Sequence, residues 1–562
     1  MRCTLQEKNS ATPIRWDTTC DAQILSYVDE DDIKTFHSLS LVNRTWCQLA
    51  IRYLWKKPFS IKKGSPKNLY KIIPIILSYL DEQQTSVLKI QKTKVRTRSS
   101  KNYMTPPSIN YPSYIRQLDF NKLFSLITEW INKSHRPKFK KNYFIKNSDK
   151  FTFDFSIFEE DEEYELNFSY DRFIERCCLK DQEKLAFFEY IFKIIIAKSK
   201  GIEKLFVEIY HEDNEIPYTI PKDFFGYIFR LKDVARCFSG LSEFTCEGNF
   251  HKASLINEIK KYSHEIKKLN ICPWDRNYVN DLKPKKDLKE LLKVQKNLKS
   301  FSFSVDSDIE NNIIECIQGM VVNTLESFQM QLGEITNNEL KHLTKCKNMR
   351  KLSFDRVYFD EPINALGKII YPELEELIFF NCVFLNQSID MLKEFFKKNG
   401  NNLKIVQLNQ NNSDIPGILD YISKYCSNLN DLCVNIDNQS DVDSLFKILQ
   451  SKNNLRLLNV GYCNNDKPKF KANEFMKEFT EIFSTTKIVK LDISNWEISL
   501  DIFKNFFERS GEFLKVFEGS CIGDKKELED VIQSTSELHN RILKSFVVIE
   551  NGEFKNVKIV WK

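Results

Sequence analysis

The feature that most constrains the fold is a short apolar motif that recurs along most of the chain. A clear copy is LEELIFFNC, from Leu374 to Cys382, in which positions one, four and six are apolar and position nine is Asn or Cys. This alternation is typical of a short strand with one buried face. Clear copies begin at Leu374, Leu403, Leu455 and Ile488, and looser copies begin at Ile202, Leu241, Ile266, Leu298, Leu325, Met349, Leu429, Leu514 and Leu543.

The spacing of the copies indicates what lies between the strands. Ten steps from Leu241 to Leu514 cover 273 residues, a mean of about 27 residues per step. Motif and spacing together are those of a leucine-rich repeat that carries a full helix opposite each strand. Apolar residues at helical spacing predict helices over Ala253–Tyr262, Ile313–Met320, Ile389–Lys397, Ile415–Tyr425, Val442–Leu449, Phe475–Phe483 and Ile502–Phe507.

These repeats predict the fold class. One repeat cannot cover its own apolar face, so neighbouring repeats must stack to build a continuous core. We therefore expect an α/β solenoid over residues 201–562, with parallel strands on the concave face and helices on the convex face. The last repeat needs a cover, and Ser545–Glu550 and Lys555–Trp561 are predicted strands joined at Asn551-Gly552. We expect this C-terminal hairpin to cap the solenoid.

A second apolar stretch, Ile24–Phe59, lies near the N-terminus. Asp29, Asp31 and Asp32 are candidate caps for one helix, and Asn43 is a candidate cap for the next, which stops before Pro58. A shorter apolar run precedes both helices. Three helices of this length cannot hide all the aromatic and aliphatic side chains present, so part of this surface is predicted to face another protein.

The order of residues in this stretch resembles an F-box. The resemblance rests on Ile24-Leu25-x-Tyr27-Val28, on Asp31-Asp32-Ile33, on the run from Leu39 to Trp46 and on Leu54-Trp55. The family implies a three-helix module that docks on the Skp-type adaptor of an SCF-type cullin–RING ubiquitin ligase. On this resemblance the expected adaptor-binding residues are Ile24, Leu25, Tyr27, Val28, Ile33, Phe36, Leu41, Val42, Trp46, Leu54 and Trp55.

The chain is thus expected to have three parts: a helical module at 14–60, a helical linker region at 61–200 and the solenoid at 201–562. Within the linker region we predict a basic flexible stretch at about 83–117, because six Lys or Arg and no acidic residue occur from Lys89 to Lys101. A solvated connector is the favoured interpretation. Phosphate binding or nuclear import is the alternative.

Composition and motifs argue against several other classes of protein. The net charge of +6 is modest for 562 residues and does not favour nucleic acid as a partner. The 15 cysteines contain no C-x-x-C pair, so we expect reduced thiols and a cytoplasmic or nuclear location. No apolar run is long enough to span a bilayer. No nucleotide-binding, nucleophile-elbow or zinc-protease motif occurs, and we expect no catalytic residue, metal or cofactor.

The repeat pattern also predicts where a target protein would bind. Positions three, five and seven of each copy should point away from the core, onto the concave face. Most of these residues are polar, but Ile378, Phe380, Ile405 and Leu457 are apolar and fall on strands expected to be close together. The expected target-binding residues are Glu376, Ile378, Phe380, Ile405, Gln407, Asn409, Asp431, Leu457, Asn459, Lys490 and Asp492.

Together these features predict a substrate-recognition subunit of an SCF-type ubiquitin ligase. Its F-box would bind the adaptor, its repeats would bind a target protein, and ubiquitin transfer would fall to other subunits. The alternative is a leucine-rich-repeat scaffold that binds protein or RNA without a ligase. That alternative stays open because Trp16-Asp17 stands where F-boxes usually carry a Leu-Pro pair.

Overall fold

The structure is a computed structural model that divides into two compact units, Met1–Leu241 and Ser242–Lys562. It describes residues 23–30, 32–59, 69–81, 107–134, 179–209, 224–248, 252–271, 283–304, 314, 317, 321–359, 364–384, 386–409, 417–436, 438–451, 454–461, 472–509, 513–522, 525–538, 543–551 and 554–561. The predicted helix Ile313–Met320, most of the basic stretch 83–117 and the Trp16-Asp17 pair lie outside these residues.

Two capped helices open the described part of the first unit. α2 (Ile33–Leu39) begins after Asp32, whose side chain accepts a hydrogen bond from the Thr35 N–H at 3.0 Å. α3 (Arg44–Leu54) begins after Asn43, whose side chain accepts from the Trp46 N–H at 2.9 Å. Each cap satisfies one of the N–H groups that a helix start leaves without an intrahelical partner. The two caps are residues that the sequence marks as candidates.

The rest of the first unit packs helices against two short parallel strands, β1 and β2. Four phenylalanine rings surround Phe120 with centroid distances from 4.9 to 6.0 Å: those of Phe188, Phe192, Phe225 and Phe229. These aromatic contacts form the core of the unit. Its further elements are η1 (Leu69–Lys71), α4 (Ile72–Leu77), η2 (Tyr111–Tyr114), β1 (Gln117–Asp119), α6 (Phe120–Ser134), α9 (Leu179–Lys198), β2 (Lys204–Ile209), α10 (Phe224–Ile228) and α11 (Val234–Phe238).

The second unit is a mixed α/β structure with a large, mostly parallel sheet. Neighbouring strands from β3 to β15 are parallel. β17 then pairs with β15 and with β16 in antiparallel fashion. In spatial order the strands are β3 (Glu243–Gly248), β4 (Lys268–Ile271), β5 (Ser300–Ser304), β6 (Ser327–Gln331), β7 (Lys351–Asp355), β9 (Glu376–Phe380), β11 (Ile405–Asn409), β12 (Asp431–Asn435), β13 (Leu457–Gly461), β14 (Lys490–Ser499), β15 (Val516–Ile522), β17 (Phe554–Trp561) and β16 (Leu543–Asn551).

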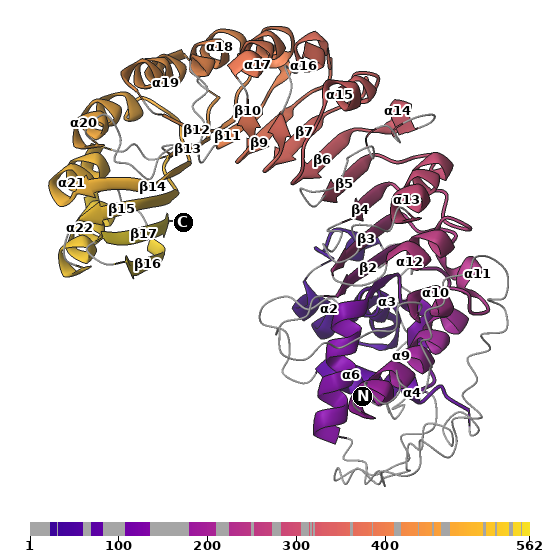
Figure 1. The fold of residues 1–562 in the computed structure, drawn as a ribbon. Coiled ribbons are helices and arrows are strands. Elements are labelled where there is room, and N and C mark those ends of the chain that lie inside the picture. The colour runs from indigo at the N-terminus through magenta and orange to yellow at the C-terminus, as the bar shows by residue number, and fades with distance from the viewer. Residues whose placement is uncertain are drawn as a thin grey trace. The chain divides into compact units, whose positions relative to one another are not determined.

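Helices alternate with these strands and line up along one side of the strand row (Figure 1). Six of them, α12 and α17 to α21, agree with helices predicted from apolar spacing, whereas α13, α14, α15, α16 and α22 were not predicted. The helices are α12 (Lys252–Ile259), α13 (Lys283–Val294), α14 (Val321–Thr324), α15 (Asn337–Leu343), α16 (Asn364–Lys368), α17 (Asn386–Asn399), α18 (Ile418–Tyr425), α19 (Gln439–Ser451), α20 (Ala472–Phe483), α21 (Leu500–Arg509) and α22 (Lys525–Leu538), with η7 (Gly400–Asn402) after α17.

One backbone contact recurs between neighbouring strands. The residues at positions two and three of a motif copy both donate their N–H to the carbonyl oxygen at position two of the preceding copy. Glu375 and Glu376 donate to the Arg350 carbonyl at 2.8 and 2.9 Å, and Lys404 and Ile405 donate to the Glu375 carbonyl at 2.8 and 3.0 Å. Because the contact uses backbone atoms only, it fixes the strand register whatever the side chains are.

Three neighbouring strands end in the same unusual backbone conformation. Leu332, Arg356 and Asn381, the residues directly after β6, β7 and β9, have positive φ angles of 64°, 55° and 51°. This left-handed turn redirects the chain. Two short strands follow it, β8 (Tyr358–Phe359) and β10 (Val383–Phe384), which pair as a second, two-stranded parallel sheet.

The C-terminal strands form an antiparallel hairpin, as the sequence predicts. Val557, Ile559 and Trp561 of β17 are buried. The Trp561 ring lies 5.7 Å from that of Phe507, and its Nε1 donates to Ser536 Oγ at 3.2 Å. The hairpin therefore covers the side of β15 that faces away from β14, and it adds apolar side chains to the core there.

Candidate protein-docking surfaces

Five large apolar side chains near the N-terminus are exposed to solvent. They are Ile24, Tyr27, Ile33, Leu41 and Val42, with exposed fractions between 46% and 84%. We call them the N-terminal apolar surface. Nine large apolar side chains in the described residues are at least 46% exposed, and five of them fall within 19 consecutive positions. Exposed apolar side chains gathered in this way are typical of a surface to which another protein binds.

The packing of α2 and α3 explains why these side chains stay outside. Phe36 of α2 stacks on Tyr53 of α3 with ring centroids 4.6 Å apart, and Ala50 and Ile51 of α3 are buried. Leu41 and Val42 lie in the turn between the two helices and have no place in this core. The apolar surface is therefore a consequence of how few residues the short helices can bury.

The other predicted adaptor-binding residues are less accessible. Leu25 and Phe36 are buried, so they can support the surface and cannot line it. Val28, Trp46, Leu54 and Trp55 are partly buried. The Trp55 ring stacks on Tyr111 of η2 with centroids 4.6 Å apart. Trp55 therefore joins the N-terminal helices to the segment before β1.

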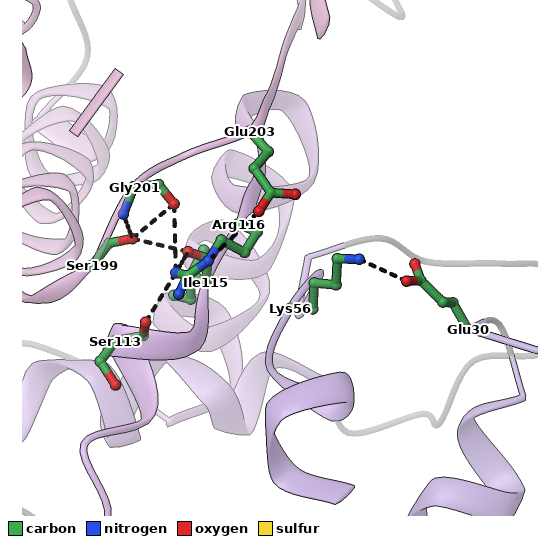
Figure 2. A network of polar contacts seen from close by, with 8 residues as sticks. All are labelled: Glu30, Lys56, Ser113, Ile115, Arg116, Ser199, Gly201 and Glu203. Carbon is green, nitrogen blue, oxygen red and sulfur yellow. Dashed lines mark hydrogen bonds and ion pairs between the residues drawn. The ribbon is translucent and has the colours of Figure 1, made fainter. Parts of the chain in front are cut away.

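Polar contacts hold the end of the N-terminal helices to the first strand, and Figure 2 draws those made by the Lys56 and Arg116 side chains. The Lys56 carbonyl accepts hydrogen bonds from the N–H groups of Arg116 and Gln117 at 2.9 and 3.0 Å. The Arg116 side chain donates to the Ser113 and Ile115 carbonyls at 2.9 and 2.8 Å. Lys56 also forms an ion pair with Glu30 at 2.6 Å. The helices and the strand are thus joined by backbone and side-chain bonds together.

The same network continues to β2. The Arg116 carbonyl accepts from the N–H groups of Glu203 and Lys204 at 2.7 and 3.0 Å, and Ser199 Oγ donates to the Ile115 carbonyl at 2.9 Å. The Lys56, Arg116 and Glu203 contacts follow the pattern that recurs between strands of the second unit. Ile115, Leu118 and Phe120 are all buried and match positions one, four and six of the motif. This extra motif copy lies in the predicted linker region, and its apolar spacing was the signal that the sequence analysis missed.

Most of the predicted target-binding residues fall into two rows across the strands of the second unit, and Phe380 and Asn409 pair with each other in a third. Strand register places Glu376, Ile405, Asp431, Leu457 and Lys490 side by side. The second row contains Ile378, Gln407, Asn459 and Asp492, and between Gln407 and Asn459 it contains Cys433, which is buried. Phe380 is exposed, whereas Ile378, Ile405 and Leu457 are partly buried. The Asn409 side chain lies outside the described residues.

Two charged residues of these rows form ion pairs with residues of the neighbouring strands β7 and β15. Glu376 forms an ion pair with Lys351 at 2.7 Å, and Lys490 forms one with Glu518 at 3.6 Å. Asn459 donates to the Asp492 carboxylate at 3.0 Å. Burial raises the pKa of Asp431, and nearby Lys490 acts in the opposite direction. Lys351 and Glu518 were not predicted, because a pairing across strands depends on register.

The cysteine thiols in the described residues are buried. Burial raises the pKa of the Cys346, Cys382 and Cys433 thiols to about 12. At neutral pH these side chains stay in the unreactive thiol form. Within the described ranges, no group of three His, Cys, Asp or Glu is placed to hold a metal ion. An open polar pocket of about 420 Å³ lies before β9, β11, β12 and β13, lined by Pro372, Glu373, Glu375, Asn402, Lys404, Asn428, Asn430 and Asn454.

Among the helices in the part of the chain that the structure describes, none has both the length and the apolarity needed to cross a bilayer. Comparison with models of known protein families gave no match. A comparison with curated proteins found no similar sequence either. The two surfaces, one apolar and N-terminal and one on the strands of the second unit, are therefore the basis for a functional assignment.

Proposed function

We propose that the chain is the substrate-recognition subunit of an SCF-type E3 ubiquitin ligase. In this proposal residues 24–59 form an F-box that docks on a Skp-type adaptor, and the strands and helices after them form a leucine-rich-repeat solenoid that binds a target protein. The observation that carries the proposal is the N-terminal apolar surface. Its five residues are all among those that the resemblance to an F-box assigns to adaptor binding.

The physical argument is one of apolar area. Tyr27, Leu41 and Val42 are exposed to water. When a partner covers such apolar side chains, the free energy of binding becomes more favourable by about 25 cal/mol per Å² of apolar surface buried. A soluble chain with this surface uncovered would be prone to nonspecific association. A permanently bound partner would cover the N-terminal apolar surface and prevent that nonspecific association. An adaptor subunit is such a partner.

The strand row supports the second half of the proposal. Its strands share one register, alternate with helices and carry a partly apolar, partly charged face. Phe380 is exposed at the end of β9, and Ile378 precedes it by two residues on the same face. A face of this composition suits a folded protein target, because apolar contacts supply affinity and the paired charges around them supply specificity.

The test is binding of the full chain to purified Skp-type adaptor. Leu41→Asp and Val42→Asp place a charge in the surface, and each should weaken adaptor binding about thirtyfold or more, the loss typical of a central interface residue. Ile370→Asp is a matched control, since Ile370 is equally exposed and lies in the second unit. Circular dichroism checks that each variant is folded.

Two results would overturn the proposal. The first is no binding of the unmodified chain to the adaptor. The second is binding by folded Leu41→Asp and Val42→Asp variants that equals that of Ile370→Asp. If the chain ignores the adaptor and still recovers protein or RNA from cell extract, the alternative of a scaffold without a ligase takes its place.

A further inference from the structure

β16 is the last strand of the sheet in the second unit, and it is long. It has nine residues and pairs with β17 along one edge. In the described part of the chain, no strand pairs with its other edge. The backbone N–H and C=O groups on that edge can therefore pair with a further strand. By contrast, β1 of the first unit has only three residues, so it has few backbone groups with which a further strand could pair.

The sequence of β16 suits it to pairing. LKSFVVIEN contains five large apolar residues, no proline and no glycine, and its two charges cancel. Leu543 and Val547 are among the exposed large apolar side chains of the chain. Natural proteins usually protect a long apolar edge with charges, prolines or bulges. Here one irregularity occurs, between Leu543 and Ser545, and it leaves the run from Ser545 to Asn551 regular.

The hairpin register shows which backbone groups are free. Asn551 pairs with Phe554 across two connecting residues, so this pair is hydrogen-bonded and every second pair after it is too. Ser545, Val547 and Ile549 therefore direct their N–H and C=O groups toward β17. The groups at positions 546, 548 and 550 point to the open edge.

The charges of β16 favour antiparallel pairing with a second copy of the same strand over parallel pairing. Lys544 and Glu550 stand three residues before and three residues after Val547. In antiparallel pairing centred on Val547, each Lys544, at the irregularity before the regular run, comes to the end of the pairing where Glu550 of the other copy lies. In parallel pairing each lysine would be opposite a lysine. Opposite charges across a strand pair stabilise it, and like charges destabilise it.

We propose that β16 is a dimerisation edge, at which it pairs antiparallel with β16 of a second copy around a two-fold axis at Val547. In that register the Val547 side chains meet at a pair without mutual hydrogen bonds, where side chains come closest. The half-exposed Val547 is thereby covered, and the outward groups at 546 and 548 bond to 548 and 546 of the other copy. The contact is isologous, so it closes at two chains.

The test is sedimentation of the full chain over a range of micromolar concentrations, without adaptor or target. The unmodified chain should show a reversible monomer–dimer equilibrium. Val547→Lys places two lysines directly opposite each other and should weaken dimerisation about tenfold or more. Ser545→Lys is the matched control, with the same charge on the same face of the strand. Its opposite position is Ile549, so it should weaken the dimer much less.

A charge exchange tests the antiparallel orientation of the two copies. Lys544→Glu and Glu550→Lys should each weaken the dimer, and the double variant should restore it. A chain that stays monomeric at every concentration would overturn the proposal. A strand of another protein would then be the candidate partner of the β16 edge. A dimer that Val547→Lys leaves intact, or a double variant that fails to recover, would overturn the placement at β16. None of these outcomes depends on the proposed ligase function.

Discussion

At the scale of single residues, position nine of the motif shows two unlike side chains doing the same work. The Cys382 thiol donates to the Phe354 carbonyl at 3.4 Å, and Trp496 Nε1 donates to the Val460 carbonyl at 2.7 Å. Both acceptors are at position six of the preceding motif copy. In these two copies position nine holds a hydrogen-bond donor that reaches back one strand, and both Cys and Trp can supply it.

This role predicts the effect of Trp496→Phe. The substitution keeps a ring beside Phe475, whose centroid lies 4.5 Å away, but it removes the donor to Val460. We expect the free energy of unfolding to fall by about 1–3 kcal/mol, the cost of losing one buried hydrogen bond. Urea denaturation measures it. Trp55→Phe keeps the stack on Tyr111 and serves as the control, and an equal loss in both variants would contradict the argument.

The buried thiols predict how stability depends on pH. An unfolded cysteine ionises near its ordinary pKa of 9.0, whereas burial raises the pKa of Cys433 to about 12 in the folded chain. The stability from this group is complete below about pH 9 and is lost as pH rises toward 12. Cys433→Ala should make the loss of stability between these values shallower. Native thiols that titrate near pH 9 by thiolate absorbance would refute this.

At the scale of elements, apolar periodicity is enough to predict the strands and most helices of the second unit. The helices Val442–Leu449 and Phe475–Phe483 lie inside α19 and α20, because a buried face recurs there every three or four residues. The small sheet of β8 and β10 was not predictable in this way. Its strands follow left-handed turns at Arg356 and Asn381, and of these two residue types arginine does not favour that conformation.

The candidate surfaces were predictable only in part, because the burial of each side chain depends on tertiary packing. Sequence marks the stretch from Ile24 to Trp55 as too apolar for three short helices, but it does not say which side chains are buried. Leu25 is buried and its neighbour Ile24 is exposed, a difference set by the packing of α2 and α3. The hydrogen bond from the Arg116 N–H to the Lys56 carbonyl could not be predicted from the sequence, because it joins backbone atoms.

The C-terminal hairpin supplies the prediction at this scale. Deleting residues 551–562 removes β17, which lies between β15 and β16 and buries Val557, Ile559 and Trp561. We expect a lower melting temperature and lower solubility, because the edge of β15 and the ring of Phe507 lose their cover. Trp561→Ala should give a smaller loss of the same kind. A soluble truncation with an unchanged melting temperature would show that the hairpin is not a cap.

At the scale of the whole molecule, the two candidate surfaces belong to different compact units. The N-terminal apolar surface lies in Met1–Leu241, and the strand face with Phe380 lies in Ser242–Lys562. Substitutions in one should therefore leave the fold of the other intact, because each unit has its own core. This separation makes adaptor binding and target binding measurable one at a time.

The corresponding prediction concerns Phe380→Ala combined with Ile405→Ser. Both residues lie on the face of the strand row, so the pair should reduce recovery of target proteins about tenfold while adaptor binding stays unchanged. Quantitative affinity purification with and without the two substitutions measures it. Unchanged target recovery would move the target site elsewhere on the chain. Loss of both activities would indicate a folding defect.

The backbone contact that joins each strand to the one before it has an evolutionary consequence. The Arg350, Glu375 and Lys404 carbonyls each accept two N–H groups of the next motif copy, whatever side chains those copies carry. A duplicated or deleted segment of one strand and one helix would meet its new neighbour through the same atoms. Lineages of such a chain can therefore change length in whole steps by unequal recombination, with no compensating substitution at the junction.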